Sequence, residues 1–509
     1  MAYHVNLYLL IFLPAVVLCY SLAPQRIRRI ILLLANAAFY LSVSRHLIVF
    51  ILGTAIFTYY TGLKIDSAGE IPNRKKNWLL LAIIALLAVL ALLKYTNFAL
   101  ANLNRLAQFF TGNEPFTIRK ILVPLGISFY TLEALGYLLD VYWKRLPAEK
   151  NFWKLLLFLS FFPTVMEGPI CRYGDVGDPL WECRRATAEE VEMGVLRILW
   201  GLFKKMLVAD RLNTIVATVY GNPDQYTGYV TAGIAIFYTI QLYMEFSGAM
   251  DMVIGSALLF GVKLPENFRQ PFFAKSASEF WRRWHISLGV WFKNYIFYPV
   301  TLSDLAKKWN KTARKKYGKH IAKVGTSMLA LFPVWMCNGL WHGPQWNYIF
   351  YGVYYFVLLS LEVILEPAKK SFDGAKIFQK WPVLLGILQT AKTWVIIFAG
   401  ELFFRADGLG QGFRMFFNIF KPYVQDPTKT SIWRHLGIAR SDWAVIALGI
   451  LVVGAADCMI EWQQQTGKTL RLSGPNWRYA YVFVLFGAVI LLGAYGAGYL
   501  AVDLIYAGF

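Results

Sequence analysis

Long apolar runs separated by short charged clusters dominate this chain. A run of about 20 apolar residues is long enough to cross a bilayer as a helix. Segments that mix charge with aromatic residues, such as 196–207 and 267–284, are better read as interfacial or re-entrant helices. The apolar runs fall at residues 3–22, 30–43, 46–63, 78–98, 121–143, 152–170, 194–218, 229–260, 284–300, 324–343, 346–365, 382–404, 443–461 and 478–506.

This pattern predicts an all-α, polytopic integral membrane protein with about 11 transmembrane helices plus re-entrant or interfacial helices. Composition agrees, because 57% of the 509 residues are hydrophobic and 17% are aromatic. Only 16% are charged, against about 25% in soluble proteins. Length alone would suggest about three soluble domains. The apolar runs favour a single membrane domain over residues 1–509 instead.

The formal net charge of +21 is concentrated in short basic clusters between the apolar runs. Such clusters control membrane topology, and nothing here resembles a groove for nucleic acid. Clusters at 26–29, 74–76 and 144–150 follow the first, third and fifth predicted helices. The positive-inside rule therefore places these loops in the cytoplasm and the N-terminus outside. Anionic lipid headgroups and an anionic acyl donor are candidate partners for the basic clusters.

The strongest basic cluster is the predicted loop 307–323, with eight cations in seventeen residues. We expect it on the cytoplasmic side. The helix that leaves it should begin near Val324, so His342 would lie about 27 Å further along the helix axis. On this estimate His342 sits toward the outer side of the membrane.

The segment 332–355 has no charged side chain apart from a possible imidazolium at His342. Ionisable groups at that depth are costly and usually mark function. An imidazole can accept a proton from a hydroxyl as that hydroxyl attacks a thioester. Gly339 and Gly343 would allow close approach of backbone and substrate, and Trp341 would supply a wall. A histidine that only hydrogen-bonds a neighbouring helix carbonyl is an equally good interpretation of this segment alone.

A second histidine, His285, ends the segment 279–285, which also contains Arg282 and Arg283. Spacing alone favours an amphipathic interfacial helix in which Glu279 pairs with Arg283 at i, i+4. The alternative places both arginines near the phosphates of a nucleotide-bearing donor and His285 at the reaction channel.

Several carboxylates lie inside apolar segments, and buried carboxylates need partners. For Glu245 and Asp251 an arginine or histidine is the natural partner, and Glu401 could pair with Arg405 one helical turn away. Cys171 and Cys183 share a loop and could pair in an oxidising compartment. No spacing typical of a metal site is present.

An ordered series of motifs resembles the membrane-bound O-acyltransferase family, most closely its bacterial branch of alginate O-acetyltransferase and teichoic acid D-alanyl transfer proteins. The most specific motif is Glu279-Phe-Trp-Arg-Arg-Trp-His-Ile-Ser-Leu288. The series spans about residues 120–410, and its other members are Pro124–Thr131, Gly168–Ile170 with Arg172, Phe246–Gly248 with Asp251, Leu264–Phe268, Asn338–Gly343 and Phe403–Arg405.

The resemblance implies that His342 is the catalytic histidine and His285 a second functional histidine. It implies a funnel-shaped helical fold in the bacterial cytoplasmic membrane, where a cytoplasmic acyl thioester meets a tunnel to the outer face. The donor would be acetyl-CoA or an acyl carrier protein, with no bound cofactor and no metal. The acyl group, most simply acetyl, would pass to a hydroxyl of a cell-surface polysaccharide or of an extracytoplasmic partner protein.

Within this chemistry we expect His342 to act as general base, and His285 with Asn338 to position or polarise the thioester carbonyl. The expected substrate-binding residues are Asn338, Trp341, Arg282, Arg283 and Asp251. One alternative is D-alanyl transfer from an acidic carrier protein that docks on residues 307–323. A polysaccharide flippase is an alternative of another class, but its expected internal repeat is missing from the sequence.

Overall fold

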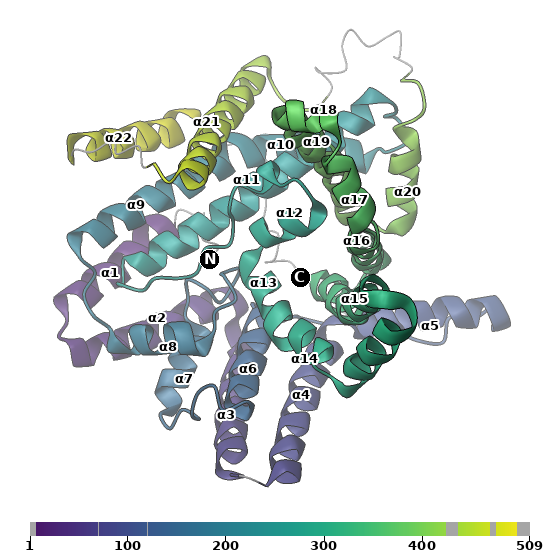
Figure 1. The fold of residues 1–509 in the computed structure, drawn as a ribbon. Coiled ribbons are helices and arrows are strands. Elements are labelled where there is room, and N and C mark those ends of the chain that lie inside the picture. Colours follow the sequence, from purple (N-terminus) through teal and green to yellow (C-terminus); the bar gives the residue numbers. More distant parts are fainter. Residues whose placement is uncertain (1–6, 70, 120, 424–435, 469–474, 496–509) are drawn as a thin grey trace. The chain divides into compact units, whose positions relative to one another are not determined.

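The computed structural model describes residues 7–69, 71–119, 121–423, 436–468 and 475–495. Within these ranges the chain is helical, and its only β-type pairing is an isolated bridge between Phe268 and Trp284. The predicted all-α class is therefore confirmed (Figure 1).

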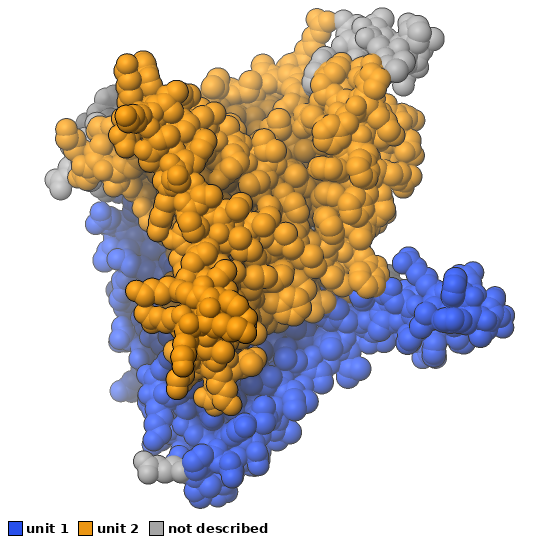
Figure 2. Space-filling view, turned by 45° about the vertical axis from the view of Figure 1, so that its right-hand side comes forward, with its two compact units in different colours: residues 1–201, 249–265, 503–509 blue, residues 202–248, 266–502 orange. Residues whose placement is uncertain are grey.

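The chain divides into two compact units (Figure 2). Unit 1 comprises residues 1–201, 249–265 and 503–509, and unit 2 comprises 202–248 and 266–502. That the whole chain acts as a single domain stays a prediction.

In unit 1, α3 packs against α4, α6 and α7. Asp140, a buried carboxylate of this unit, is paired with arginines, as expected for a carboxylate away from water. Asp140 accepts from Arg145 at 3.0 Å and from Arg172 at 3.4 Å. The helices of unit 1 are η1 (Leu7–Phe12), α1 (Leu13–Leu22), α2 (Gln25–Ser44), η2 (Arg45–Leu47), α3 (Ile48–Ser67), α4 (Pro72–Lys94), α5 (Thr96–Thr111), α6 (Ile127–Tyr142), α7 (Phe152–Ser160), α8 (Tyr173–Glu182) and most of α9 (Ala188–Phe203).

In unit 2, α15 packs along α16, and α16 packs along α19. The helix α11 (Tyr229–Leu258) begins in unit 2 and ends in unit 1. The other helices of unit 2 are η3 (Lys204–Ala209), α10 (Asp210–Gly221), η4 (Pro271–Phe273), α12 (Ala277–Arg283), α13 (Ile286–Phe292), η5 (Lys293–Phe297), α14 (Tyr298–Thr301), α15 (Asp304–His342), α16 (Trp346–Ile364), α17 (Glu366–Asp373), α18 (Lys376–Lys380), α19 (Pro382–Arg405), α20 (Leu409–Asn418), α21 (Arg440–Thr466) and α22 (Pro475–Leu492).

Six helical segments in the described residues are long and apolar enough to cross a membrane. The predicted number of about 11 spans is not confirmed. One reason is that several predicted runs are broken into shorter helices. The predicted helix 152–170, for example, ends at Ser160, three residues before Pro163, which has no N–H with which to continue the helix. The six candidates are Gln25–Ser67, Pro72–Lys94, Asp304–His342, Trp346–Ile364, Pro382–Arg405 and Arg440–Thr466.

The predicted basic loop 307–323 is in fact helical and contains the turn of a hairpin within α15: residues 307–317 belong to the first arm, and residues 319–323 begin the second. The chain turns at Gly318, whose φ of +89° is accessible mainly to glycine. Trp309 of the first arm lies directly against Gly325 of the second, where a Cβ would sit 2.2 Å from the indole Nε1. The second arm therefore begins just after Gly318, earlier than the expected Val324, and runs to His342.

All five cysteines are free thiols. The possible pairing of Cys171 with Cys183 is therefore wrong. Each thiol instead donates to a nearby carbonyl, Cys171 to Pro169 and Cys183 to Leu180.

Candidate active site

His342 is the last residue of α15 and is buried, with 5% of its surface exposed. Its ring is enclosed by aromatic rings of α16 and α19. Ring centroids lie 6.0 Å away at Tyr351, 6.3 Å away at Tyr348 and 4.9 Å away at Phe404. The imidazole therefore sits in a largely apolar environment.

Two glycines bring α15 and α16 into direct backbone contact beside His342. A Cβ on Gly339 would lie 2.4 Å from the carbonyl oxygen of Tyr348, and a Cβ on Gly352 would lie 2.4 Å from that of Trp335. The expected close approach at Gly339 is confirmed, and the neighbour it admits is a helix backbone. This packing fixes the end of α15, and hence the imidazole, against α16.

His285 lies between α12 and α13, outside the six candidate spans, with a left-handed backbone (φ 46°, ψ 52°) that is uncommon for a residue with a side chain. The turn is held by the preceding segment. The amide N–H of Ile286 donates to the carbonyl of Asn267 at 3.0 Å, and the amide of Ser287 donates to Oδ1 of Asn267 at 2.9 Å. The sequence motif 264–268 thus provides the support on which His285 is oriented.

Oδ1 of Asn267 also lies 3.4 Å from Nδ1 of His285. The bonds from Ser287 identify this atom as the amide oxygen, which can only accept a hydrogen bond. The Nδ1 atom of His285 must therefore be the donor in this contact, so the neutral ring carries its proton on Nδ1. Burial lowers the pKa of the His285 imidazole to about 3. The ring is therefore neutral near pH 7, and its Nε2 carries a lone pair.

Trp341 connects the two histidines. Its ring centroid is 5.6 Å from that of His285 and 5.1 Å from that of His342. The ring of Phe246, from the Phe-Ser-Gly motif, lies 4.8 Å from His285. Two histidines that are 57 positions apart in the sequence thus pack against one indole.

Asn338 lies one helical turn before His342 and is 7% exposed. Its Oδ1 has no hydrogen-bond partner among the described residues. A buried amide normally has such a partner, so this side chain is suited to meet a ligand.

The other expected substrate-binding residues are placed elsewhere. Arg282 is exposed. Arg283 is held by two carboxylates, Glu279 at 2.8 Å and Glu461 at 2.7 Å. Its guanidinium is thus already engaged, as the interfacial-helix interpretation predicted. Asp251 belongs to unit 1 and pairs with Arg197 at 2.9 Å, which confirms the expected arginine partner.

Glu401 and Arg405 make no ion pair with each other, so the expected pairing is wrong. Oε1 of Glu401 instead accepts from the hydroxyl of Tyr351 at 2.7 Å, and the Arg405 guanidinium lies 5.3 Å from the ring centre of Tyr220. Tyr351 also packs against His342. The pattern of residues gave no signal for Tyr351. It marked Asn267 only as a member of the motif 264–268 and did not show its contact with His285, because both residues act through contacts between segments far apart in the chain.

A cavity of about 320 Å³ opens on the face of α15 that also carries His342. Ser327 and Leu331 line it, and Trp335, Asn338 and His342 continue the same face at three- and four-residue spacing. On α16 the lining residue Leu359 is likewise one turn from Tyr355. Beyond the cavity, Trp281, Trp335 and Tyr355 form a cluster with ring centroids 4.8–5.1 Å apart. This cluster lies between the cavity and the rings around His342.

The fold and the site define a multi-pass, all-helical membrane enzyme with a buried pair of histidines. Residues 78–314 match the model of MBOAT, the membrane-bound O-acyltransferase family. The chain is 31% identical to a probable alginate O-acetylase of Pseudomonas syringae, over 93% of this chain and 86% of that protein. It is 30% identical to the peptidoglycan O-acetyltransferase of Helicobacter pylori, over 74% of this chain and 71% of that protein.

A further relative is the teichoic acid D-alanyltransferase of Bacillus subtilis, 30% identical over 52% of this chain and 65% of that protein. The chain therefore belongs to the membrane-bound O-acyltransferase family, and it is an O-acyltransferase. The resemblance inferred from the motifs is confirmed.

Proposed function

We propose that this protein transfers a short acyl group, most simply acetyl, from a cytoplasmic thioester to a hydroxyl at the outer face of the bacterial cytoplasmic membrane. The hydroxyl would belong to a cell-surface polysaccharide or to an extracytoplasmic partner protein. The observation that carries the proposal is the pair of buried histidines that both pack against Trp341. The names of the relatives, which include alginate and peptidoglycan acetyltransferases, favour acetyl and a polysaccharide.

His342 would act as the general base. Its imidazole takes the proton of the acceptor hydroxyl while that oxygen attacks the thioester carbonyl carbon. The carbon–sulfur bond then breaks, and the imidazolium returns its proton to the departing thiolate. The products are an ester and a free thiol, and His342 ends the cycle neutral.

Asn338 is the better candidate for polarising the thioester carbonyl. Its amide can donate to the oxygen that becomes negative, a type of contact that contributes several kcal/mol. His285 fits a different role from the one expected, because its Nδ1–H is directed at Asn267 and its Nε2 can only accept. We therefore assign His285 to orienting the acceptor hydroxyl, or a water beside it, through Nε2.

The cavity of about 320 Å³ is our candidate entrance for the donor arm. It lies on the helix face that leads to His342. Two exposed lysines, Lys369 and Lys392, line it and could meet the phosphates of the donor. On this route the thioester must pass the ring cluster of Trp281, Trp335 and Tyr355.

The test is acyl release from radiolabelled acetyl-CoA by the purified protein in liposomes. His342→Ala should abolish turnover while the protein stays folded in detergent. His320→Ala is the matched control, because His320 is also on α15 and its Nε2–H donates to the carbonyl oxygen of Ile364 at 3.0 Å. Turnover retained in His342→Ala would refute the proposed role. Turnover absent even from the wild type would indicate a carrier-protein donor or a required acceptor partner.

A further inference from the structure

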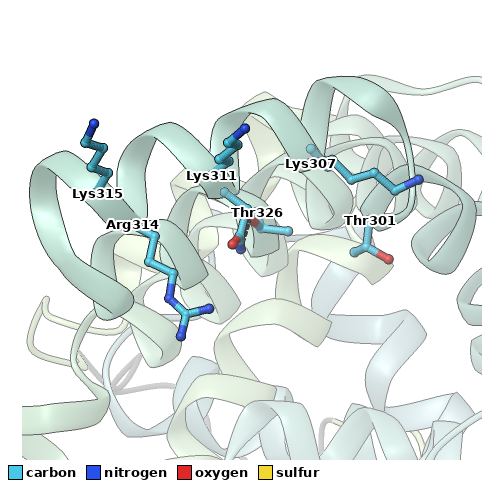
Figure 3. Close-up of a pocket in the computed structure, with 8 residues that line it drawn as sticks. Thr301, Lys307, Lys311, Arg314, Lys315 and Thr326 are labelled. Atoms are coloured by element: carbon cyan, nitrogen blue, oxygen red, sulfur yellow. Dashed lines mark hydrogen bonds between the residues drawn. The ribbon is translucent and has the colours of Figure 1, made fainter.

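A second cavity, of about 560 Å³, lies in the hairpin of α15 (Figure 3). Four cations line it together with three polar side chains. Asn310 of the first arm and Thr326 of the second are hydrogen-bonded to each other at 3.4 Å, which ties the two arms together at this point. The lining residues are Thr301, Ala306, Lys307, Asn310, Lys311, Arg314, Lys315 and Thr326.

The four cations are not neutralised by the protein. None of Lys307, Lys311, Arg314 and Lys315 forms an ion pair with a carboxylate in the part of the chain that the structure describes. Cations gathered around one cavity repel one another. A bound anion would remove this repulsion, and phosphate oxygens are the acceptors that Lys and Arg bind best.

Apolar side chains on the same segment are exposed beside the cations. Leu302 and Leu305 are each 65% exposed, and Trp309 and Tyr317 are also exposed. Trp and Tyr are enriched where a membrane protein crosses the headgroup region. The hairpin adjoins a candidate membrane span, because its second arm runs on as the apolar part of α15. Cations and exposed apolar groups together are typical of a helix lying at a membrane surface.

The position of this cavity argues against a role for it in holding the acyl donor. Thr326 precedes His342 by sixteen residues, which corresponds to about 24 Å along the helix and a rotation of about 160°. This cavity therefore lies on the side of α15 away from His342, whereas the cavity of about 320 Å³ opens on the face that carries His342.

We infer that this hairpin cavity is a binding site for the headgroup phosphate of an anionic phospholipid, with the lipid chains lying along the exposed leucines. The inference is independent of the transfer reaction. It assigns Lys307, Lys311 and Arg314 to the phosphate, and it makes the hairpin a membrane anchor for the end of α15 opposite the active site.

The test compares two triple variants of the full-length protein, K307Q/K311Q/R314Q and K308Q/K316Q/K319Q. Both remove three positive charges from the same hairpin, but only the first set lines the cavity. Native mass spectrometry would measure the phosphatidylglycerol retained from mixed micelles with phosphatidylcholine. We expect the cavity variant to bind phosphatidylglycerol roughly a hundredfold more weakly, at about fivefold per cation, and the control variant to bind like the wild type.

Equal weakening in both variants would overturn the inference, because it would indicate general surface attraction without a site. Displacement of the lipid by free CoA would also overturn it, since the cavity would then belong to the donor. The single variant Lys311→Gln, expected to weaken binding about fivefold, covers the case in which a triple variant fails to fold.

Discussion

The side-chain oxygen of Asn267 receives the Nδ1–H of His285 at 3.4 Å, across eighteen residues of chain. The same oxygen accepts the backbone N–H and the hydroxyl of Ser287 at 2.9 and 3.0 Å. One buried amide therefore fixes both the turn that presents His285 and the position of the proton on its ring. The lone pair on Nε2 follows from that geometry.

Replacing Asn267 with alanine should lower the acyl-transfer rate by roughly 100-fold. The loss leaves the His285 N–H and two donors of Ser287 without their acceptor, which should also cost about 1–3 kcal/mol of stability for each donor left buried. Turnover in liposomes and the thermal midpoint in detergent would measure the two effects. Ser287→Ala is the control, because it removes one donor to Asn267 and leaves the contact with His285 intact. If Ser287→Ala lost as much activity as Asn267→Ala, the orienting role of Asn267 would be wrong.

The buried, neutral state of His285 predicts a pH dependence of stability. Burial lowers its folded-state pKa from 6.5 to about 3, so between these values the unfolded chain binds more protons than the folded one. The stabilising contribution of neutral His285 to the free energy of unfolding should therefore be fully present above about pH 6.5. It should be lost progressively as the pH is lowered toward 3. Thermal midpoints measured from about pH 8 to about pH 5 would show the slope. A variant with an amide that cannot titrate in this range, His285→Asn, should show a shallower slope, and an unchanged slope would contradict the assignment.

Two tyrosines on α16 allow a structural contribution to be separated from a functional one. The hydroxyl of Tyr351 donates to Glu401 at 2.7 Å, and that of Tyr354 donates to the carbonyl of Ile396 at 2.8 Å. Each bond joins α16 to α19, but of the two residues Tyr351 is the one that packs against His342. Both Tyr→Phe variants should lose about 1–3 kcal/mol of stability. Only Tyr351→Phe should also lower the turnover number; equal activity of the two would exclude a role for the Tyr351–Glu401 pair in positioning His342.

The sequence predicted the helical class and the family, because apolar run length and local motifs carry that information, and the same motifs singled out both histidines as candidates. It could not predict that His342 and His285 meet through Trp341, because that contact depends on how α15 packs against residues 246–285. The prediction that the basic segment 307–323 is a loop was wrong. A cluster of positive charges indicates on which side of the membrane a segment lies, but it does not prevent that segment from being helical. The lysines, arginines and alanines of this segment are good helix formers. What folds the two helical arms into a hairpin is the glycine turn at Gly318 and the contact of Trp309 with Gly325.

The close contact of α15 with α16 gives a prediction about how His342, the proposed general base, is held in place. A methyl group on Gly339 would lie 2.4 Å from the carbonyl oxygen of Tyr348, so Gly339→Ala must push the two helices apart. We expect a loss of about 1–3 kcal/mol of stability and, because the end of α15 moves, a fall in turnover that is large relative to the change in donor KM. Gly454→Ala in α21 is the matched control, since the added methyl would meet no atom within 4 Å, and helical glycine-to-alanine changes are otherwise favourable by roughly 0.5–1 kcal/mol. Thermal midpoints and steady-state kinetics of the two variants decide the matter: if Gly339→Ala behaved like Gly454→Ala in both, the α15–α16 contact would not be what holds His342 in place.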